Sequence, residues 1–253
     1  MNLTKLNNRL WAIAPHAFGA VRQVLASAAD PEAFLNLSDF VVLRPEAAMD
    51  DLGNGHIHIQ GALGDKMPNI WGMVGNTDYR QLRGEIAAVR SAGAEGLVLH
   101  IDSPGGMVSG LEEAGQAILD ANLPTVAQVD GMACSAAYYL ACQADSITAT
   151  PSSEVGNIGT VLAWADDTAF WESMGVEFNV MTNEGADLKG TFRDSPMTSS
   201  QREFLQDQID RHGAEFRATV KGNRTVDPEV FRAGWYSGEQ AQSLGLIDTI
   251  TKL

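Results

Sequence analysis

The stretch PTVAQVDGMACSAAYYLACQADSITATP, residues 124–151, predicts a buried strand, a turn of small residues, a short helix and a second strand. Ser135 stands where the turn ends and the helix begins. Serine is a favoured helix cap, and a serine at a helix start also lies beside free backbone amides, which suits a nucleophile. This stretch alone therefore leaves both roles open for Ser135.

Strand and helix patterns also alternate upstream of this stretch. GHIHIQGALG from Gly55 and GLVLHIDSPGG from Gly96 have the pattern of strands, and residues 77–93 between them have helical spacing. A second helix is expected to begin near Ser109, with Glu112 in capping-box position. This alternation predicts an α/β layer architecture with largely parallel strand pairing.

The downstream half predicts more helix than strand. We expect a helix that ends at Met174, a strand in VEFNVMT (residues 176–182), and a long helix from Thr198 to about Lys221. Between the last two lies NEGADLKGTFRDSP, a loop rich in small and charged residues.

Composition and length limit the function classes. The chain has 253 residues and a net charge of −15, so it can bury a sizeable core but lacks the basic surface that nucleic acids require. Its longest apolar run is far shorter than the ~20 residues that span a bilayer, so no membrane anchor is expected. We expect residues 1–50 to form a helical arm and residues 51–253 a single domain.

The two cysteines, Cys134 and Cys142, both lie in the opening stretch. A helix between them would separate them by about 11 Å along its axis, which is too far for a disulfide. They lack the histidine neighbours of a metal site, so we interpret them as small core residues and expect no metal.

Two apolar strands end at small residues, one at IDSPGG (residues 101–106) and one at VDGMACS (residues 129–135). Ligand sites in parallel sheets lie at the carboxyl ends of strands, so both turns are expected to border one site. The glycine pair allows bare backbone N–H groups to face a ligand and to hold a developing oxyanion.

A serine nucleophile needs a base, and two residue types are available. His100 is the best-placed histidine, but its position between two apolar strand residues favours a structural role. Lys189 lies in the small-residue loop, and a lysine base must be buried to lose its proton. Spacing alone does not decide between a base and a solvated loop lysine.

Five motifs, in chain order, resemble those of the signal peptide peptidase A-like serine peptidases, a family that includes the head-maturation proteases of tailed phages. They span residues 55–250 and read IDSPGGMVSG, GMACSAAYYLACQAD, ATPSSEVGNIGTV, NEGADLKGTF and YSGEQAQSLGLIDTI. The resemblance implies the fold shared with Clp proteases and crotonases, in which stacked ββα units often build rings.

The resemblance also assigns site residues. Ser135 matches the nucleophile and Lys189 the general base, which makes residues 51–253 a Ser–Lys peptidase domain. The backbone N–H groups of Gly106 and Ala136 match the oxyanion hole. Asn157 stands where the family often has a serine that holds the lysine. Its amide oxygen can accept from Lys189, or Asn157 supplies only turn geometry.

The implied function is that of a serine endopeptidase without cofactor or metal, working as a homo-oligomeric ring whose sites face a shared interior. Without an expected anchor, the phage branch fits best: a protease inside the procapsid, in the host cytoplasm, that cuts scaffold and capsid proteins. The alternatives are a soluble bacterial signal-peptide-peptidase-like enzyme, a crotonase-like acyl-CoA-binding protein, and a nonenzymatic relative of the fold.

Overall fold

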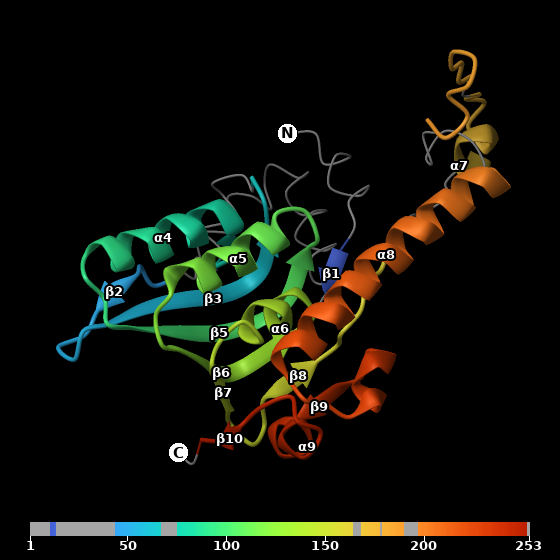
Figure 1. The fold of residues 1–253 in the computed structure, drawn as a ribbon. Helices are drawn as coiled ribbons and strands as arrows, with labels where there is room; N and C mark the ends of the chain where they lie inside the picture. The colour runs from blue at the N-terminus through green and yellow to red at the C-terminus, as the bar shows by residue number, and fades with distance from the viewer. Residues whose placement is uncertain are drawn as a thin grey trace.

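The computed structural model describes residues 11–13, 44–66, 75–163, 168–177, 179–189 and 197–251. Their strands are β1 (Trp11–Ile13), β2 (Ala48–Met49), β3 (Asn54–Gly64), β4 (Thr77–Asp78), β5 (Gly96–Met107), β6 (Thr125–Cys134), β7 (Ser146–Ala149), β8 (Glu154–Gly156), β9 (Trp235–Ser237) and β10 (Thr249–Ile250). They form one sheet whose main path runs β10-β7-β6-β5-β3-β2 (Figure 1). Neighbouring strands from β10 to β3 are parallel, as the sequence predicts.

The register of the central strands explains why apolar and polar residues alternate along them. Ile57 on β3 pairs with Leu99 on β5, which pairs with Ala127 on β6, which pairs with Ile147 on β7. All four side chains are fully buried, so they form one continuous row across the sheet. Since strand side chains alternate between faces, the residues between them lie on the opposite, less buried face.

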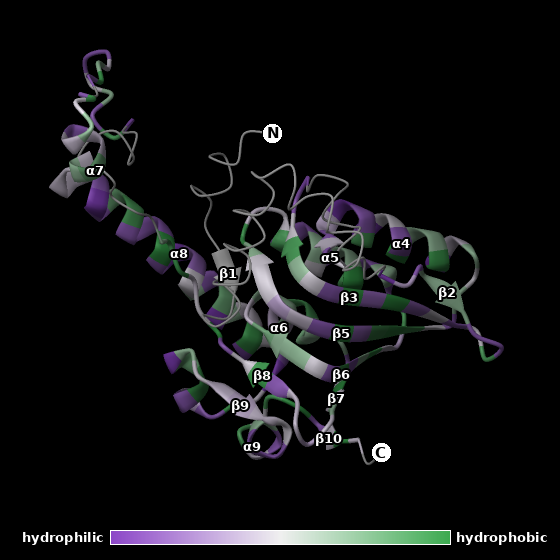
Figure 2. Ribbon diagram, turned by 180° about the vertical axis from the view of Figure 1, so that it is seen from behind, coloured by the Kyte–Doolittle hydropathy of each residue, from purple (hydrophilic) through white to green (hydrophobic). Residues whose placement is uncertain are grey.

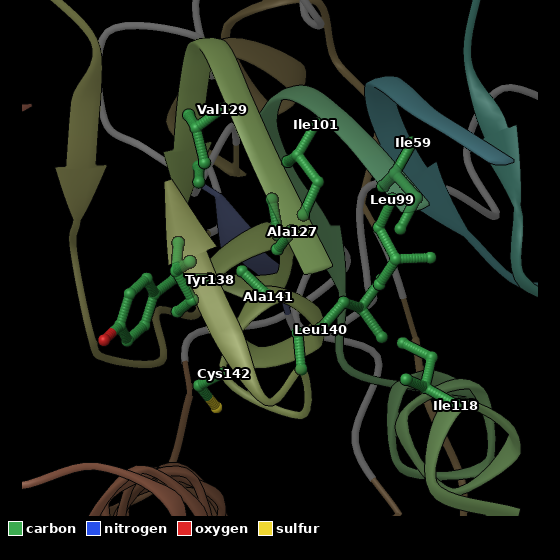
Figure 3. Close-up of a cluster of buried hydrophobic side chains, with 14 of the residues drawn as sticks. Ile59, Leu99, Ile101, Ile118, Ala127, Val129, Tyr138, Leu140, Ala141 and Cys142 are labelled. Atoms are coloured by element: carbon green, nitrogen blue, oxygen red, sulfur yellow. The ribbon is translucent and has the colours of Figure 1, made fainter. Parts of the chain in front are cut away.

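The helices are α4 (Tyr79–Ser91), α5 (Leu111–Ala121), α6 (Ala136–Ala141), α7 (Thr168–Ser173), α8 (Ser199–Asn223) and α9 (Gly238–Ser243), with a 3-10 helix at Pro228–Arg232. Helices α4, α5 and α6 lie on one side of the sheet (Figure 1). Figure 3 shows Ile118 of α5 and Leu140 of α6 packed toward Leu99 and Ile101 of β5. Each such side chain contributes about 1.5–3 kcal/mol by leaving water, so this layer is the core of the molecule.

The first half of helix α8 projects away from the sheet and its covering helices (Figure 1). Thr198 and Gln201 form a capping box at its start, and its buried apolar residues, Phe216 and Val220, lie near its end. Figure 1 shows its first half projecting away from the sheet, with α7 at its far end. Figure 2 shows the same projection from behind. Among the described residues, no helix is both long and apolar enough to cross a bilayer.

The C-terminal elements brace α6 and the edge of the sheet. The Tyr138 hydroxyl of α6 donates to the Leu246 carbonyl at 2.9 Å. The Asp248 carboxylate accepts from the Ile147 amide of β7 at 2.7 Å and pairs with Arg224 at the end of α8, also at 2.7 Å. The terminal motif of the sequence therefore fixes the helix that follows Ser135.

Three expectations are wrong. Helix α5 begins at Leu111 behind Gly110, whose φ of 87° makes a left-handed turn, so Ser109 and Glu112 form no capping box. The described part of 176–182 contains no strand, because it lies away from the sheet and has no strand to pair with. Trp11–Ile13 is a strand rather than a helix, because it pairs with β5. The rest of the predicted arm up to residue 43 lies outside the described residues.

Candidate active site

Ser135 joins β6 to α6 in an unusual backbone conformation. Its φ of 56° and ψ of −120° belong to a region that non-glycine residues avoid at a cost of about 1–3 kcal/mol. The conformation is held on both sides, since the Ser135 amide donates to Gly156 O at 2.8 Å and its carbonyl accepts from the Tyr139 amide at 2.9 Å. Ser135 makes no side-chain capping bond to α6, so the helix-cap interpretation is wrong.

The surroundings of Ser135 are small and dry. Ser135 is 1% exposed, and Ala133, Ala136 and Ala137 are fully buried around it. Cys134, the preceding residue, is also buried, and its Sγ contacts the Glu154 carbonyl at 3.5 Å. Burial, with a smaller effect from Glu154, raises the pKa of the Cys134 thiol to about 12. Cys134 is therefore a neutral thiol at pH 7 and no competitor to Ser135 as a nucleophile.

The glycine turn at the end of β5 is fixed by Ser103. The buried Ser103 hydroxyl donates to Gly61 O at 2.6 Å and accepts from the Gly105 amide at 3.1 Å. Gly105 has a φ of 100°, which glycine adopts readily. A Cβ on Gly106 would overlap the Leu63 carbonyl of β3. Both glycines are therefore required by the backbone itself.

Asp102 ties this turn to the serine turn. Its Oδ1 accepts from the Met132 amide of β6 at 3.0 Å, and a Cβ on Gly131 would overlap its carboxylate. Neither Asp102 nor Ser103 is predicted from the sequence to be a functional residue, although both lie inside IDSPGG. The sequence signal for their role is a pair of short polar residues directly before a glycine turn. Together they hold both strand ends at one side of the sheet.

The two expected oxyanion donors lie close to those strand ends, Gly106 within β5 and Ala136 as the first residue of α6. Ser103 of β5 pairs with Ala133 of β6, and Gly106 and Ala136 each follow that pair by three residues. Their backbone amides therefore come from the end of β5 and from the start of α6, directly after Ser135. Their role in stabilising an oxyanion stays a prediction.

Asn157 lies in the turn after β8. Its φ is 54°, its backbone amide donates to Gly234 O at 2.7 Å, and its side-chain NH₂ donates to Ala233 O at 2.9 Å. These bonds support the turn interpretation of Asn157 and tie it to the C-terminal segment. Its amide oxygen as a support for Lys189 stays a prediction.

The structure does not bring Lys189 of the same chain to Ser135. Lys189 is exposed, and its loop is fastened to the start of α8 by Gln201, whose Nε2 donates to Asp187 O at 2.8 Å. Phe216, whose ring contacts Tyr139 of α6 with centroids 5.5 Å apart, follows Gln201 by 15 residues. A helix rises 1.5 Å per residue, so the two contacts are about 22 Å apart along α8.

The histidines of the sheet form a stack away from Ser135. His100 Nε2 lies 2.8 Å from His56 Nδ1, and its ring stacks on His58 with centroids 4.6 Å apart. Burial first, and then charge on neighbouring histidines, lowers the pKa of His58 and of His100. His100 pairs with Gln128 of β6, seven residues before Ser135, so its position agrees with the structural role expected from the sequence.

Residues 117–253, more than half of the chain, match the model of Peptidase family S49. The chain belongs to peptidase family S49. S49 enzymes are serine peptidases of the Ser–Lys dyad type, so membership of this family favours a peptidase over the acyl-CoA-binding alternative.

Several curated S49-like proteases are similarly distant. The chain is 28% identical over 201 residues to the capsid assembly protease C of Escherichia phage lambda, covering 76% of this chain and 45% of that protein. It is 28% identical over 204 residues to protease 4 of Salmonella typhi, covering 77% and 32%. It is 29% identical over 178 residues to the chloroplastic serine protease SPPA of Arabidopsis thaliana, covering 67% and 26%.

The chain spans about half the length of the first curated relatives it matches, with shares of 52%, 45% and 53%. Among solved structures, a mutant of the membrane-bound stomatin-specific protease 1510-N in complex with a substrate peptide matches with a TM-score of 0.42 and 14% identity. That match covers 77% of this chain and 74% of that one.

Proposed function

We propose that this S49 chain is an endopeptidase in which Ser135 attacks the peptide carbonyl and Lys189 accepts the proton of its hydroxyl. The carbonyl oxygen becomes an oxyanion that the backbone amides of Gly106 and Ala136 stabilise, and the protonated lysine then donates to the leaving amine. The observation that carries the proposal is the strained Ser135 backbone, because such strain persists only where the surrounding structure holds it in place.

Lys189 in this proposal comes from a second copy of the chain. Within one chain its loop lies at the far end of α8, and its side chain is exposed, whereas a lysine that acts as a general base works from a buried site. Large apolar side chains are exposed on the same projection, with Phe170 at 59% and Met181 at 94%. Docking this projection against another copy would bury both the apolar surface and Lys189, as a lysine base requires.

Mixed variants test this dyad. Ser135→Ala and Lys189→Ala chains should each be inactive on denatured casein, and their co-assembled mixture should regain activity, since one interface then carries an intact Ser135 and an intact Lys189. The matched control mixes Lys189→Ala with the double variant Ser135→Ala/Lys189→Ala and should stay inactive. A mixture that co-assembles by light scattering yet cleaves nothing would rule out a dyad shared between copies.

For the substrate, we propose scaffold and capsid proteins cut inside a phage procapsid in the host cell. The likeness to the lambda capsid assembly protease supports this substrate. The equal likeness to protease 4 and to chloroplastic SPPA supports a second candidate, a peptidase of bacterial signal-peptide-peptidase type. Incubation with the scaffold and capsid proteins encoded beside its gene, followed by mass spectrometry, separates the two. Discrete fragments support the first, and cleavage of short peptides alone supports the second.

A further inference from the structure

The strand edge nearest the nucleophile belongs to β5. β6 pairs with β5 as far as Ser103 and Ala133 and ends at Cys134, with β8 paired to its other edge from Met132 onward. β5 continues to Met107, still paired with β3 on its other edge. The departure of β6 toward Ser135 therefore frees one edge of β5 at Gly105–Met107.

β1 takes this freed edge. It runs antiparallel to β5, with Trp11 opposite Met107, Ala12 opposite Gly106 and Ile13 opposite Gly105. A strand has only two edges in a sheet, and β3 already holds the other one at Gly105 and Gly106. β1 must therefore occupy the edge of β5 that β6 pairs with before the Ser135 turn. Figure 1 shows β1 beside the end of β5.

An extended peptide that reaches Ser135 needs the same edge. Peptides commonly bind by adding a strand to a free sheet edge, where backbone hydrogen bonds hold them whatever their side chains. The expected oxyanion donor Gly106 lies in the middle of the three residues that β1 covers. A substrate strand and β1 cannot both pair with Gly105–Met107.

We propose that Trp11–Ile13 is an autoinhibitory strand that occupies the substrate's place on β5 and must leave before a polypeptide can bind. This inference rests on the proposed peptidase function and adds its regulation. β1 has only three residues, so it makes few ladder bonds and a longer peptide can displace it. The sequence around it, NRLWAIAPH (residues 8–16), is then itself a ligand for the edge.

The test uses the full chain with Ser135→Ala, so that bound peptide is not cut. The variant Ala12→Pro/Ile13→Pro removes two successive N–H groups. Successive N–H groups of a strand point to opposite edges, so one of the two faces β5. The control Ala12→Ser/Ile13→Val keeps both groups. The probe is a fluorescein-labelled peptide with the sequence of residues 8–16, and its binding is measured by anisotropy.

The proline variant should bind the probe about fivefold or more tightly than the control, since the apparent affinity is reduced by the fraction of molecules whose site is open. Equal affinities in two folded proteins would overturn the inference, as would failure of the probe to bind either one. The measurement needs no catalysis, so a chain without peptidase activity would refute the proposed function and leave this result to be judged separately.

Hydrogen exchange on the chain with natural residues at 12 and 13 covers the case in which the proline variant fails to fold. Saturating probe should speed amide exchange at Trp11–Ile13, because the strand loses its partner, while Gly105–Met107 stays protected by the probe. Unchanged exchange at Trp11–Ile13 with the probe bound would show that the edge it uses is not the one that β1 covers, and would refute the proposal.

Discussion

The end of the sheet around Ser135 and the far end of α8 around Lys189 are built in opposite ways. Ser135 is almost fully buried, strained, and held through its own amide and carbonyl. Lys189 is exposed. Its loop is attached to α8 by the hydrogen bond from the Gln201 side chain to the Asp187 carbonyl. The difference teaches that one chain holds the proposed nucleophile in a fixed position and leaves the proposed base exposed. Under the proposed function, a second copy of the chain covers that base.

Ser135 variants test the nucleophilic side of this comparison and have the largest expected effect. Ser135→Ala should lower kcat/KM by at least about 10⁴-fold, because the attacking oxygen is lost. Its thermal stability should barely change, since the hydroxyl makes no capping bond to α6 and its hydrogen bond to Gly159 O is long, at 3.5 Å. Ser135→Gly should be equally inactive but more stable by about 1 kcal/mol, because glycine relieves the strain at a φ of 56°. Calorimetry of both variants checks the order, and equal melting temperatures would argue against strain.

A pair of glycines sharpens the contrast in rigidity. Gly106→Ala places a methyl group on the Leu63 carbonyl, so the chain should lose about 3 kcal/mol or more and much of its activity. Gly185, in the Lys189 loop, has a φ of 77° and open space around it. Gly185→Ala should therefore cost only about 1 kcal/mol, from the backbone alone. Urea unfolding measures both, and similar losses would contradict the difference between the two regions.

Asp102 links the two turns, so its loss should affect activity more than stability. Asp102→Ala removes the acceptor of the Met132 amide, so the two turns are held less accurately relative to each other. The variant should lower kcat about tenfold or more with little change in KM, because the reacting groups are then misplaced in the transition state. Asp102→Asn keeps an oxygen at Oδ1 and should restore most of kcat. If asparagine and alanine are equally impaired, Asp102 acts through its charge instead.

Gln201 gives the smallest expected effect, on the lysine side. Its side chain serves both the capping box of α8 and the Asp187 carbonyl. Gln201→Ala should cost about 1 kcal/mol of stability and reduce activity a few-fold by loosening the Lys189 loop. Gln201→Glu keeps the capping acceptor and loses only the donor to Asp187. It should lower activity while the melting temperature stays near that of the natural chain, and unchanged activity would mean that this contact does not position the lysine.

The sequence predicts well what local patterns determine. The periodicity of residues 77–93, with Thr77 or Asp78 as the candidate cap, predicts α4, which Asp78 caps in the structure. The expected bounds Thr198 and Lys221 predict α8 to within two residues. The alternating run from Gly55 predicts β3 for the same reason. Each of these depends on residues within a few turns of one another, so the signal is present in the chain itself.

What the sequence does not predict depends on distant partners. The Ser135 amide donates to Gly156 O, which helps to hold the φ of Ser135, and the Asn157 amide donates to Gly234 O. Neither contact produces a periodic pattern in the sequence. The strand at Trp11–Ile13 exists because β6 vacates an edge nearly one hundred residues later. The place of Lys189 follows from the projection of α8, while its role as base comes only from the likeness to the family.

The buried Cys134 gives the site a chemical selectivity. With its pKa near 12, on the order of one thiol in 10⁵ is ionised at pH 7, so alkylating agents and peroxide find almost no thiolate beside the nucleophile. The reaction of serine-directed phosphonates with Ser135 does not depend on the ionisation of the Cys134 thiol. Cys134 therefore adds almost no reactive thiolate next to Ser135, and we expect thiol reagents that modify only thiolates to leave Ser135 chemistry unchanged.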